Sequence, residues 1–259
     1  MRLYKIKALM YADFMLIRNT KWKIFEFIYF PITTILIWGL FSIFVKGYAL
    51  EAGVIVLAVN ILWNFAQVAQ SHADMQINED SWSGSLKQII VSGVSDFEYI
   101  AARIFSGTIF SIGILALMIA ISMVLFDFSL IASNSGIFLI LIIATLIASI
   151  GLSIITAGAM VALGREYGFL AWTILQVFIL LSAPFYPITV FPEFIRPIVA
   201  AMPYTYIFEA TRNVIQGAVS MDVVMNGLYV AIIYFAISLP FYKYIFRKAR
   251  EKGWLVRLS

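Results

Sequence analysis

Charged residues divide this chain into long apolar stretches, and these stretches predict its architecture. Six stretches contain no Asp, Glu, Lys or Arg, namely residues 27–45, 52–73, 104–126, 128–164, 167–192 and 223–242. About 20 helical residues cross the roughly 30 Å hydrocarbon core of a bilayer, so each stretch can span one. The turn residues Ser133-Asn134-Ser135-Gly136 divide the longest stretch. The pattern predicts an all-α, polytopic membrane protein with six transmembrane helices.

The helix boundaries follow from the charged and turn residues that flank each stretch. The predicted helices cover about 25–45, 52–71, 101–126, 137–163, a segment starting near 167, and 223–246. Composition agrees, because 63% of the 259 residues are apolar and 12% are charged, about half the charged share of a soluble domain. We expect one transmembrane domain over residues 1–259.

Basic residues indicate the orientation of the helices. With six spans, fifteen of the eighteen Lys and Arg residues fall on one side, in segments 1–24 and 243–259 and at Lys87, Arg103 and Arg165. Lys and Arg are retained in cytoplasmic loops, so we predict a multi-pass protein of the cell membrane with both termini cytoplasmic. The net charge of +4 then reflects topology and contact with anionic lipids rather than nucleic-acid binding.

Residues 1–24 alternate apolar and charged positions at helical spacing. One face carries Leu3, Ile6, Leu9, Met10, Phe14 and Ile17. The charged residues Lys5, Lys7, Asp13 and Arg18 lie elsewhere. This pattern predicts an amphipathic helix in the cytoplasmic interface, and a solvated charged tail is the alternative.

The most polar stretch, residues 72–98, is predicted to be a cytoplasmic loop. Within it, Ser81 to Val91 form a short helix that Ser92-Gly93 would end. One face of this helix carries Trp82, Leu86, Ile89 and Ile90. That face either contacts a partner protein or packs on the N-terminal helix of the same chain.

Prolines interrupt the chain after the fifth apolar stretch. We predict a re-entrant helical hairpin over residues 184–222 in the outer leaflet, because broken helix at membrane depth must be covered by protein or face water. Its prolines are Pro184, Pro187, Pro192 and Pro203. Glu209 and Arg212 are three residues apart and can pair on one helical face, either as a clamp or as a gate at the outer exit.

Several kinds of chemistry are excluded by what the sequence lacks. It has no Gly-Lys dipeptide and therefore no Walker phosphate loop, and it has no cysteine and a single histidine, His72. We therefore expect no catalytic constellation, no metal site and no cofactor in this chain, and no intramembrane carboxylate of the kind that relays protons. Aromatic residues that either line a substrate path or pack the bundle are Trp38, Trp63, Phe65, Trp172 and Phe178.

Two segments resemble one membrane-protein family. Pro-Phe-Tyr-Pro from residue 184, Met202-Pro203-Tyr204, and Glu209-Ala210-Thr211-Arg212 resemble the signature of ABC type-2 permeases, with Met202 where that family usually has asparagine. The segment Gly84 to Ile90 is similar to the coupling segment of the family, with Lys87 replacing an acidic residue.

The resemblance implies a dimer of this chain with a second copy or a homologous permease. It also implies a separate cytoplasmic ABC ATPase subunit that binds ATP and Mg. The residues implied to contact this ATPase are Trp82, Leu86, Ile89 and Ile90 as an apolar face and Glu79, Asp80 and Lys87 as rim charges.

The function implied is export of an amphipathic substrate: a drug-like molecule, a lipid or a lipid-linked glycan. Two alternatives stay open, a gradient-driven secondary transporter and a structural membrane subunit that transports nothing.

Overall fold

The computed structural model describes residues 2–126 and 134–251, and these ranges contain helices and no strand. Five helices are long and apolar enough to cross a membrane: within α2 (Lys21–Lys46), α3 (Leu50–Ser83), α5 (Asp96–Phe126), α7 (Ser135–Leu163) and α11 (Met221–Glu251). The remaining helices are α1 (Leu3–Asn19), α4 (Ser85–Val91), α8 (Leu170–Leu181), α9 (Arg196–Ala201) and α10 (Thr205–Ile215). Two 3-10 turns, η1 (Arg165–Tyr167) and η2 (Ile188–Val190), flank α8.

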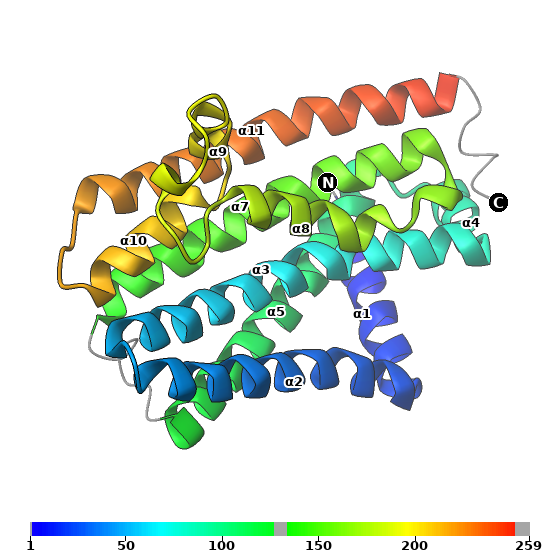
Figure 1. Cartoon of the computed structure of the whole chain (residues 1–259). Helices are drawn as coiled ribbons and strands as arrows, with labels where there is room; N and C mark the ends of the chain where they lie inside the picture. Colours follow the sequence, from blue (N-terminus) through cyan, green and yellow to red (C-terminus); the bar gives the residue numbers. More distant parts are fainter. Residues whose placement is uncertain (1, 127–133, 252–259) are drawn as a thin grey trace.

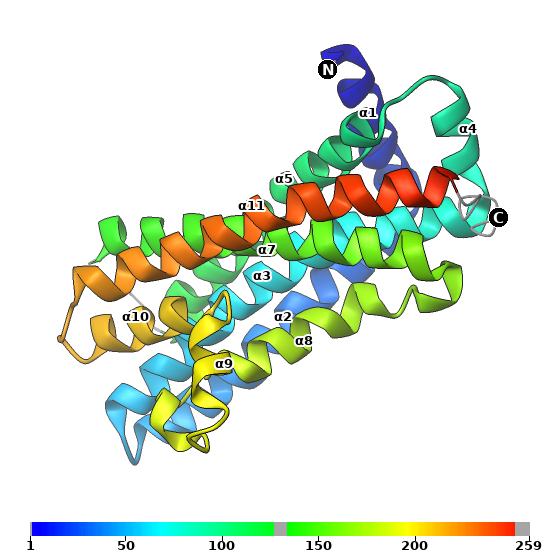
Figure 2. The same ribbon diagram turned by 90° about the horizontal axis from the view of Figure 1, so that it is seen from above.

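Helix α3 lies at the centre of the bundle. It packs on α2, α5 and α7, and 72% of its most apolar window is buried, against 22% for α2 and for α11. Helix α11 lies along the other side of α7 (Figures 1 and 2). These two helices approach closely at Gly151 of α7, where an added Cβ would lie 3.0 Å from the backbone nitrogen of Phe235 in α11, so the missing side chain of glycine allows the contact.

The two ends of the bundle differ. Helices α1 and α4 and the carboxyl end of α11 gather at one end, called here the α1–α4 end (Figures 1 and 2). Helix α10, the segment around α9 and the turn between α2 and α3 lie toward the opposite end, the hairpin end. The predicted hairpin over residues 184–222 is thus a series of short helices that precede α11.

The structure corrects the predicted loop over residues 72–98. Helix α3 continues to Ser83, and the turn comes at Gly84, whose φ of 73° is the left-handed conformation that glycine adopts most easily. The short helix α4 therefore starts at Ser85, and Trp82 belongs to α3. The polar residues His72 and Asp74, which suggested a loop, are fully buried between helices.

The predicted fifth span corresponds to a short helix. Helix α8 has 12 residues, fewer than the roughly 20 that a straight crossing needs. The chain then reverses its direction within the hairpin, before α11 begins (Figures 1 and 2). The described chain thus contains five helices long enough to span and this shorter one, where six transmembrane helices were predicted.

Candidate functional site

A cavity of about 420 Å³ opens between α2, α3 and α8. Its size lies in the range of small-molecule sites in proteins. The walls contain all three tryptophans that were predicted as possible residues of a substrate path, Trp38, Trp63 and Trp172, together with Phe30 and Met75. The cavity is therefore bounded by large apolar side chains from three helices.

One wall of this cavity is polar, which sequence reasoning missed. Asn60, Asn64, Gln67 and Ser71 recur every three or four residues, so they form one stripe along α3. The side-chain amide of Asn64 donates to the backbone carbonyl of Asn60 at 3.0 Å. The side-chain amide of Gln176 in α8 donates to the side-chain oxygen of Gln67 at 2.7 Å. Helical spacing of amides inside the apolar stretch 52–73 was the signal that could have revealed it.

The lining of this cavity combines uncharged polar groups with large apolar side chains. No Asp, Glu, Lys or Arg is among its described lining residues, so a ligand charge would lie in the cavity without a counterion. Amides and hydroxyls offer both donors and acceptors, and the indole rings offer flat apolar surface.

The other two aromatic residues predicted on the path lie elsewhere. Phe65 is fully buried in a core cluster with Ile35 and Met118, on the side of α3 facing α2 and α5. Phe178 packs edge-on against Tyr234 of α11, with ring centroids 6.1 Å apart. Both residues pack against other helices of the bundle, and neither is among the described lining residues of the cavity.

The hairpin adjoins the cavity through an aromatic contact. The Phe185 ring stacks on Trp38 with centroids 5.5 Å apart and lies 6.2 Å from the Trp63 ring. The start of the hairpin therefore rests on two residues of the cavity wall.

Arg212 stabilises the backbone at the point where α8 ends and the hairpin begins. Its side chain is buried, and Nη1 donates to the carbonyl oxygens of Ala183 at 2.6 Å and Pro184 at 3.0 Å. Carbonyls at a helix end lack amide partners, and proline brings no N–H, so a guanidinium is a suitable donor there.

The predicted ion pair between Arg212 and Glu209 does not form within the described residues. The arginine braces the backbone of the hairpin instead. Of the predicted hairpin prolines, Pro184 and Pro203 are buried and Pro187 and Pro192 are exposed.

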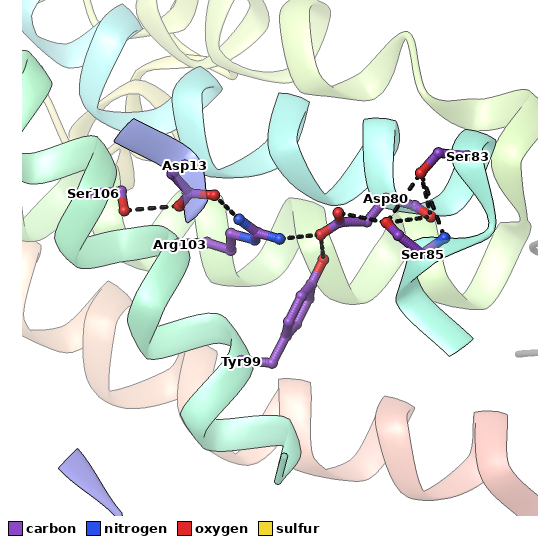
Figure 3. Close-up of polar contacts among 7 residues, drawn as sticks. All are labelled: Asp13, Asp80, Ser83, Ser85, Tyr99, Arg103 and Ser106. Carbon is purple, nitrogen blue, oxygen red and sulfur yellow. Dashed lines mark hydrogen bonds and ion pairs between the residues drawn. The ribbon is translucent and has the colours of Figure 1, made fainter. Parts of the chain in front are cut away.

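A buried charge cluster lies at the α1–α4 end (Figure 3). The Arg103 guanidinium of α5 forms salt bridges with Asp13 of α1 and with Asp80 of α3. Side-chain exposure is 4% for Arg103, 2% for Asp13 and 14% for Asp80, so these charges are inside the protein. The Ser106 hydroxyl donates to Asp13 at 2.8 Å, and the Tyr99 hydroxyl donates to Asp80 at 2.5 Å.

This cluster corrects two predictions. Asp13 was expected outside the apolar face of the N-terminal helix, and Asp80 was expected as a rim charge that contacts an ATPase. Both carboxylates face inward because Arg103, near the start of α5, is buried and needs counter-charges.

Two residues of the predicted coupling face, Leu86 and Ile89, are covered by the chain itself. Leu86 is 3% exposed in a cluster with Ile77, Ile100 and Phe246, and Ile89 packs against the same cluster. The expectation that Leu86 contacts a partner is therefore wrong. Its neighbours come from α3, α5 and α11 rather than from the N-terminal helix alone.

Other side chains near α4 remain exposed. Trp82 is 59% exposed and Val91 is 86% exposed, while Gln88 is also exposed. Glu79 is half-buried. The side chains of Lys87 and Ile90, which were predicted contacts, lie outside the described residues.

Another buried carboxylate, that of Asp74, joins α3 to α7. Ser153 of α7 donates to it at 3.0 Å, and the Gln70 amide also contacts it. The sequence assigned Asp74 to a loop, so this intrahelical carboxylate was not predicted.

These features define a polytopic helical membrane protein with a ligand-sized cavity between helices and no strand in the described ranges. The sequence matches the ABC-2 type transporter family over residues 4–216, and the chain belongs to this family. It is thus a permease component of an ABC transporter, as its resemblance implied. A comparison with individually curated proteins returns no match.

Proposed function

We propose that this chain is the membrane subunit of an ATP-driven exporter in the cell membrane, with both termini cytoplasmic. A separate ABC ATPase subunit binds ATP and Mg, and a second copy of the chain or a homologous permease completes the pore. Membership of the ABC-2 type transporter family is the observation that carries this proposal. The basic residues of α1 and of the carboxyl end of α11 support the orientation, because both of these helix segments lie at the α1–α4 end.

The ATPase docks at the α1–α4 end. Three residues there are exposed, Trp82, Gln88 and Val91, and they are called here the α4 patch. An exposed tryptophan is typical of an interface anchor. The α4 patch replaces the predicted face that included Leu86, which is covered within the chain.

The cavity between α2, α3 and α8 holds the substrate during transport. Its tryptophans contact the apolar part of an amphipathic molecule, and the stripe from Asn60 to Ser71 binds its polar groups. The absence of charge from the described lining favours uncharged polar groups such as hydroxyls or amides.

Affinity capture tests the ATPase proposal. We expect the tagged chain, purified from its native membranes in mild detergent, to carry a stoichiometric subunit with a phosphate-binding loop. Trp82→Glu and Val91→Glu should each lose most of this subunit, because a charge would be buried in an apolar contact. Phe194→Glu, at an aromatic residue 79% exposed on the hairpin, is the matched control and should keep it.

Capture without any ATPase, repeated after cross-linking, would contradict the proposal and favour a gradient-driven or structural role. Equal retention by the α4-patch variants and the control would place the docking surface elsewhere.

Stimulated ATP hydrolysis tests the substrate class. The complex in lipid nanodiscs should respond to uncharged alkyl glucosides more strongly than to alkyl sulfates or alkyl trimethylammonium salts of the same chain length. Asn64→Leu should reduce this preference, and Phe178→Leu, outside the cavity, should preserve it. A response that follows chain length alone would contradict a polar recognition site.

A further inference from the structure

Arg103 joins three helices that are distant in sequence. Its two terminal nitrogens contact different carboxylates, Nη1 contacting Asp13 of α1 and Nη2 contacting Asp80 of α3, while Arg103 itself belongs to α5 (Figure 3). A guanidinium can hold two carboxylates at fixed angles, which a lysine ammonium cannot do. One side chain therefore fixes the position of α1 relative to the end of α3.

The same cluster reaches the first residue of α4. The other oxygen of Asp80 accepts a hydrogen bond from the Ser85 hydroxyl at 2.8 Å, and Ser85 is where α4 begins. The path from α1 to α4 thus runs through Asp13, Arg103, Asp80 and Ser85.

A second set of contacts ties α1 to the segment that follows α4. The Lys5 ammonium donates to the Gly93 carbonyl, and the Arg2 amide donates to Glu98 Oε1 at 2.6 Å. Glu98 also closes a capping box at the start of α5, since it accepts from the Ser95 amide at 3.1 Å. Both sides of α4 are therefore connected to the N-terminal helix.

Burial makes this joint an all-or-none arrangement. A buried charge that loses its partner is strongly unfavourable, so the ion pairs are either complete or replaced by another ordered arrangement. Hydroxyl donors from Ser106 and Tyr99 stabilise the additional negative charge of the two carboxylates. Such a joint passes a displacement of one of its helices on to the other helices that it connects.

Helix α1 leads directly into the cavity wall. A single residue, Thr20, separates α1 from α2, and α2 contributes Phe30, Pro31, Thr34 and Trp38 to the cavity. We propose that Arg103 is a positioning residue that makes α1 and α4 one rigid unit, so that movement of α4 driven by the ATPase displaces α2 at the cavity. The transmission step rests on the proposed function, whereas the rigid unit is a property of this chain alone.

Distance measurement between two spin labels tests the rigid unit. The chain has no cysteine, so Tyr11→Cys on α1 and Ser92→Cys directly after α4 introduce labels at two exposed positions without further change. Labelled protein is diluted with unlabelled protein, so that pulsed EPR reports distances within one copy. The complex with its ATPase is measured in nanodiscs, first without nucleotide and then with ATP and vanadate.

We expect one narrow distance distribution that is the same in both nucleotide states. Asp13→Asn and Arg103→Lys weaken the joint and keep side chains of similar size, and each should raise the population of separated arrangements by roughly tenfold. Glu193→Gln, which removes an exposed ion pair with Arg196 at 3.7 Å, is the control and should leave the distribution narrow.

A positioning role also predicts uncoupling, which loss of folding would not produce. Asp13→Asn should keep the captured ATPase and its basal hydrolysis but lose the stimulation by alkyl glucoside. A distance that changes between nucleotide states in the unmodified joint, or an unaltered distribution in both variants, would overturn the proposal.

The experiment separates this inference from the proposed function. If no ATPase subunit is captured, the proposed function fails, and the nucleotide-free distances of the variants still decide whether Arg103 fixes α1 to α4.

Discussion

The two ends of this bundle each bury an arginine, but the two arginines have different surroundings. Arg103 at the α1–α4 end lies between two carboxylates, whereas Arg212 at the hairpin end donates to two backbone carbonyls. The first joins separate helices through charge. The second completes hydrogen bonding at an interrupted helix.

The comparison shows that a buried cation has no single structural meaning in a membrane bundle. The two carboxylates bound by Arg103 belong to different helices, so this joint links those helices into one unit that moves as a whole. Carbonyls at a helix end are fixed by the backbone, so the bonds of Arg212 stabilise one local conformation. We therefore expect the α1–α4 end to transmit movement and the hairpin end to resist it.

The largest effect is expected from Arg103→Leu. This change leaves Asp13 and Asp80 buried without their cation, and breaking a buried pair costs about 3–5 kcal/mol. The free energy of unfolding, measured by SDS titration in mixed micelles, should fall by that amount. Arg196→Leu is the control at an arginine 38% exposed, and an equal loss there would show that Arg103 is not special.

A smaller loss is expected from Arg212→Leu. Leucine leaves uncharged carbonyl oxygens without a donor, which costs about 1–3 kcal/mol, whereas Arg103→Leu leaves two charged carboxylates without a partner and costs more. The same titration should show a loss below that of Arg103→Leu. Arg212→Lys should recover part of it, since an ammonium can still donate to one carbonyl; a loss as large as that of Arg103→Leu would remove the distinction between the ends.

The backbone conformation of Ala183 offers a further test of whether the hairpin end is held in one local conformation. Its φ of 49° is in the left-handed region, which costs a non-glycine residue about 1–2 kcal/mol, and its carbonyl accepts from Arg212. Ala183→Val should destabilise the protein because a β-branched residue tolerates this conformation poorly. Ala183→Gly should change the unfolding free energy by less than about 1 kcal/mol. Equal effects of the two substitutions would indicate that the conformation of residue 183 does not matter.

The smallest effect is expected from Glu209→Gln. No salt bridge joins Glu209 to Arg212 in the described residues, so the substitution should cost less than about 1 kcal/mol by the same titration. A loss equal to that of Arg212→Leu would restore the predicted ion pair as the clamp of the hairpin.

The sequence predicted the membrane helices well because their signal is local. The span predicted over 137–163 is α7 from Ser135 to Leu163, and the span predicted over 223–246 lies inside α11. Apolar runs and flanking charges determine both. The interrupted segment after Pro184 was likewise visible, since proline acts on the residues next to it.

Errors arose where a polar residue is compensated by a partner far away in the chain. Asp74 ended the predicted second span, yet α3 continues because Ser153 of α7 bonds this carboxylate. Leu86 was assigned to a partner because the core that covers it comes from α3, α5 and α11. Asp13 and Asp80 were treated as exposed because nothing local indicates that Arg103 lies between them.

The continuous course of α3 has a mechanical consequence. At 34 residues the helix is about 50 Å long, some 20 Å more than the hydrocarbon thickness of a bilayer. It carries Asn60 and Asn64 of the cavity near its middle and Asp80 close to its end. A stiff rod of this length acts as a lever arm. A tilt imposed at the α1–α4 end is reduced in amplitude at the cavity, so a large movement of an ATPase becomes a small change in the width of the binding site.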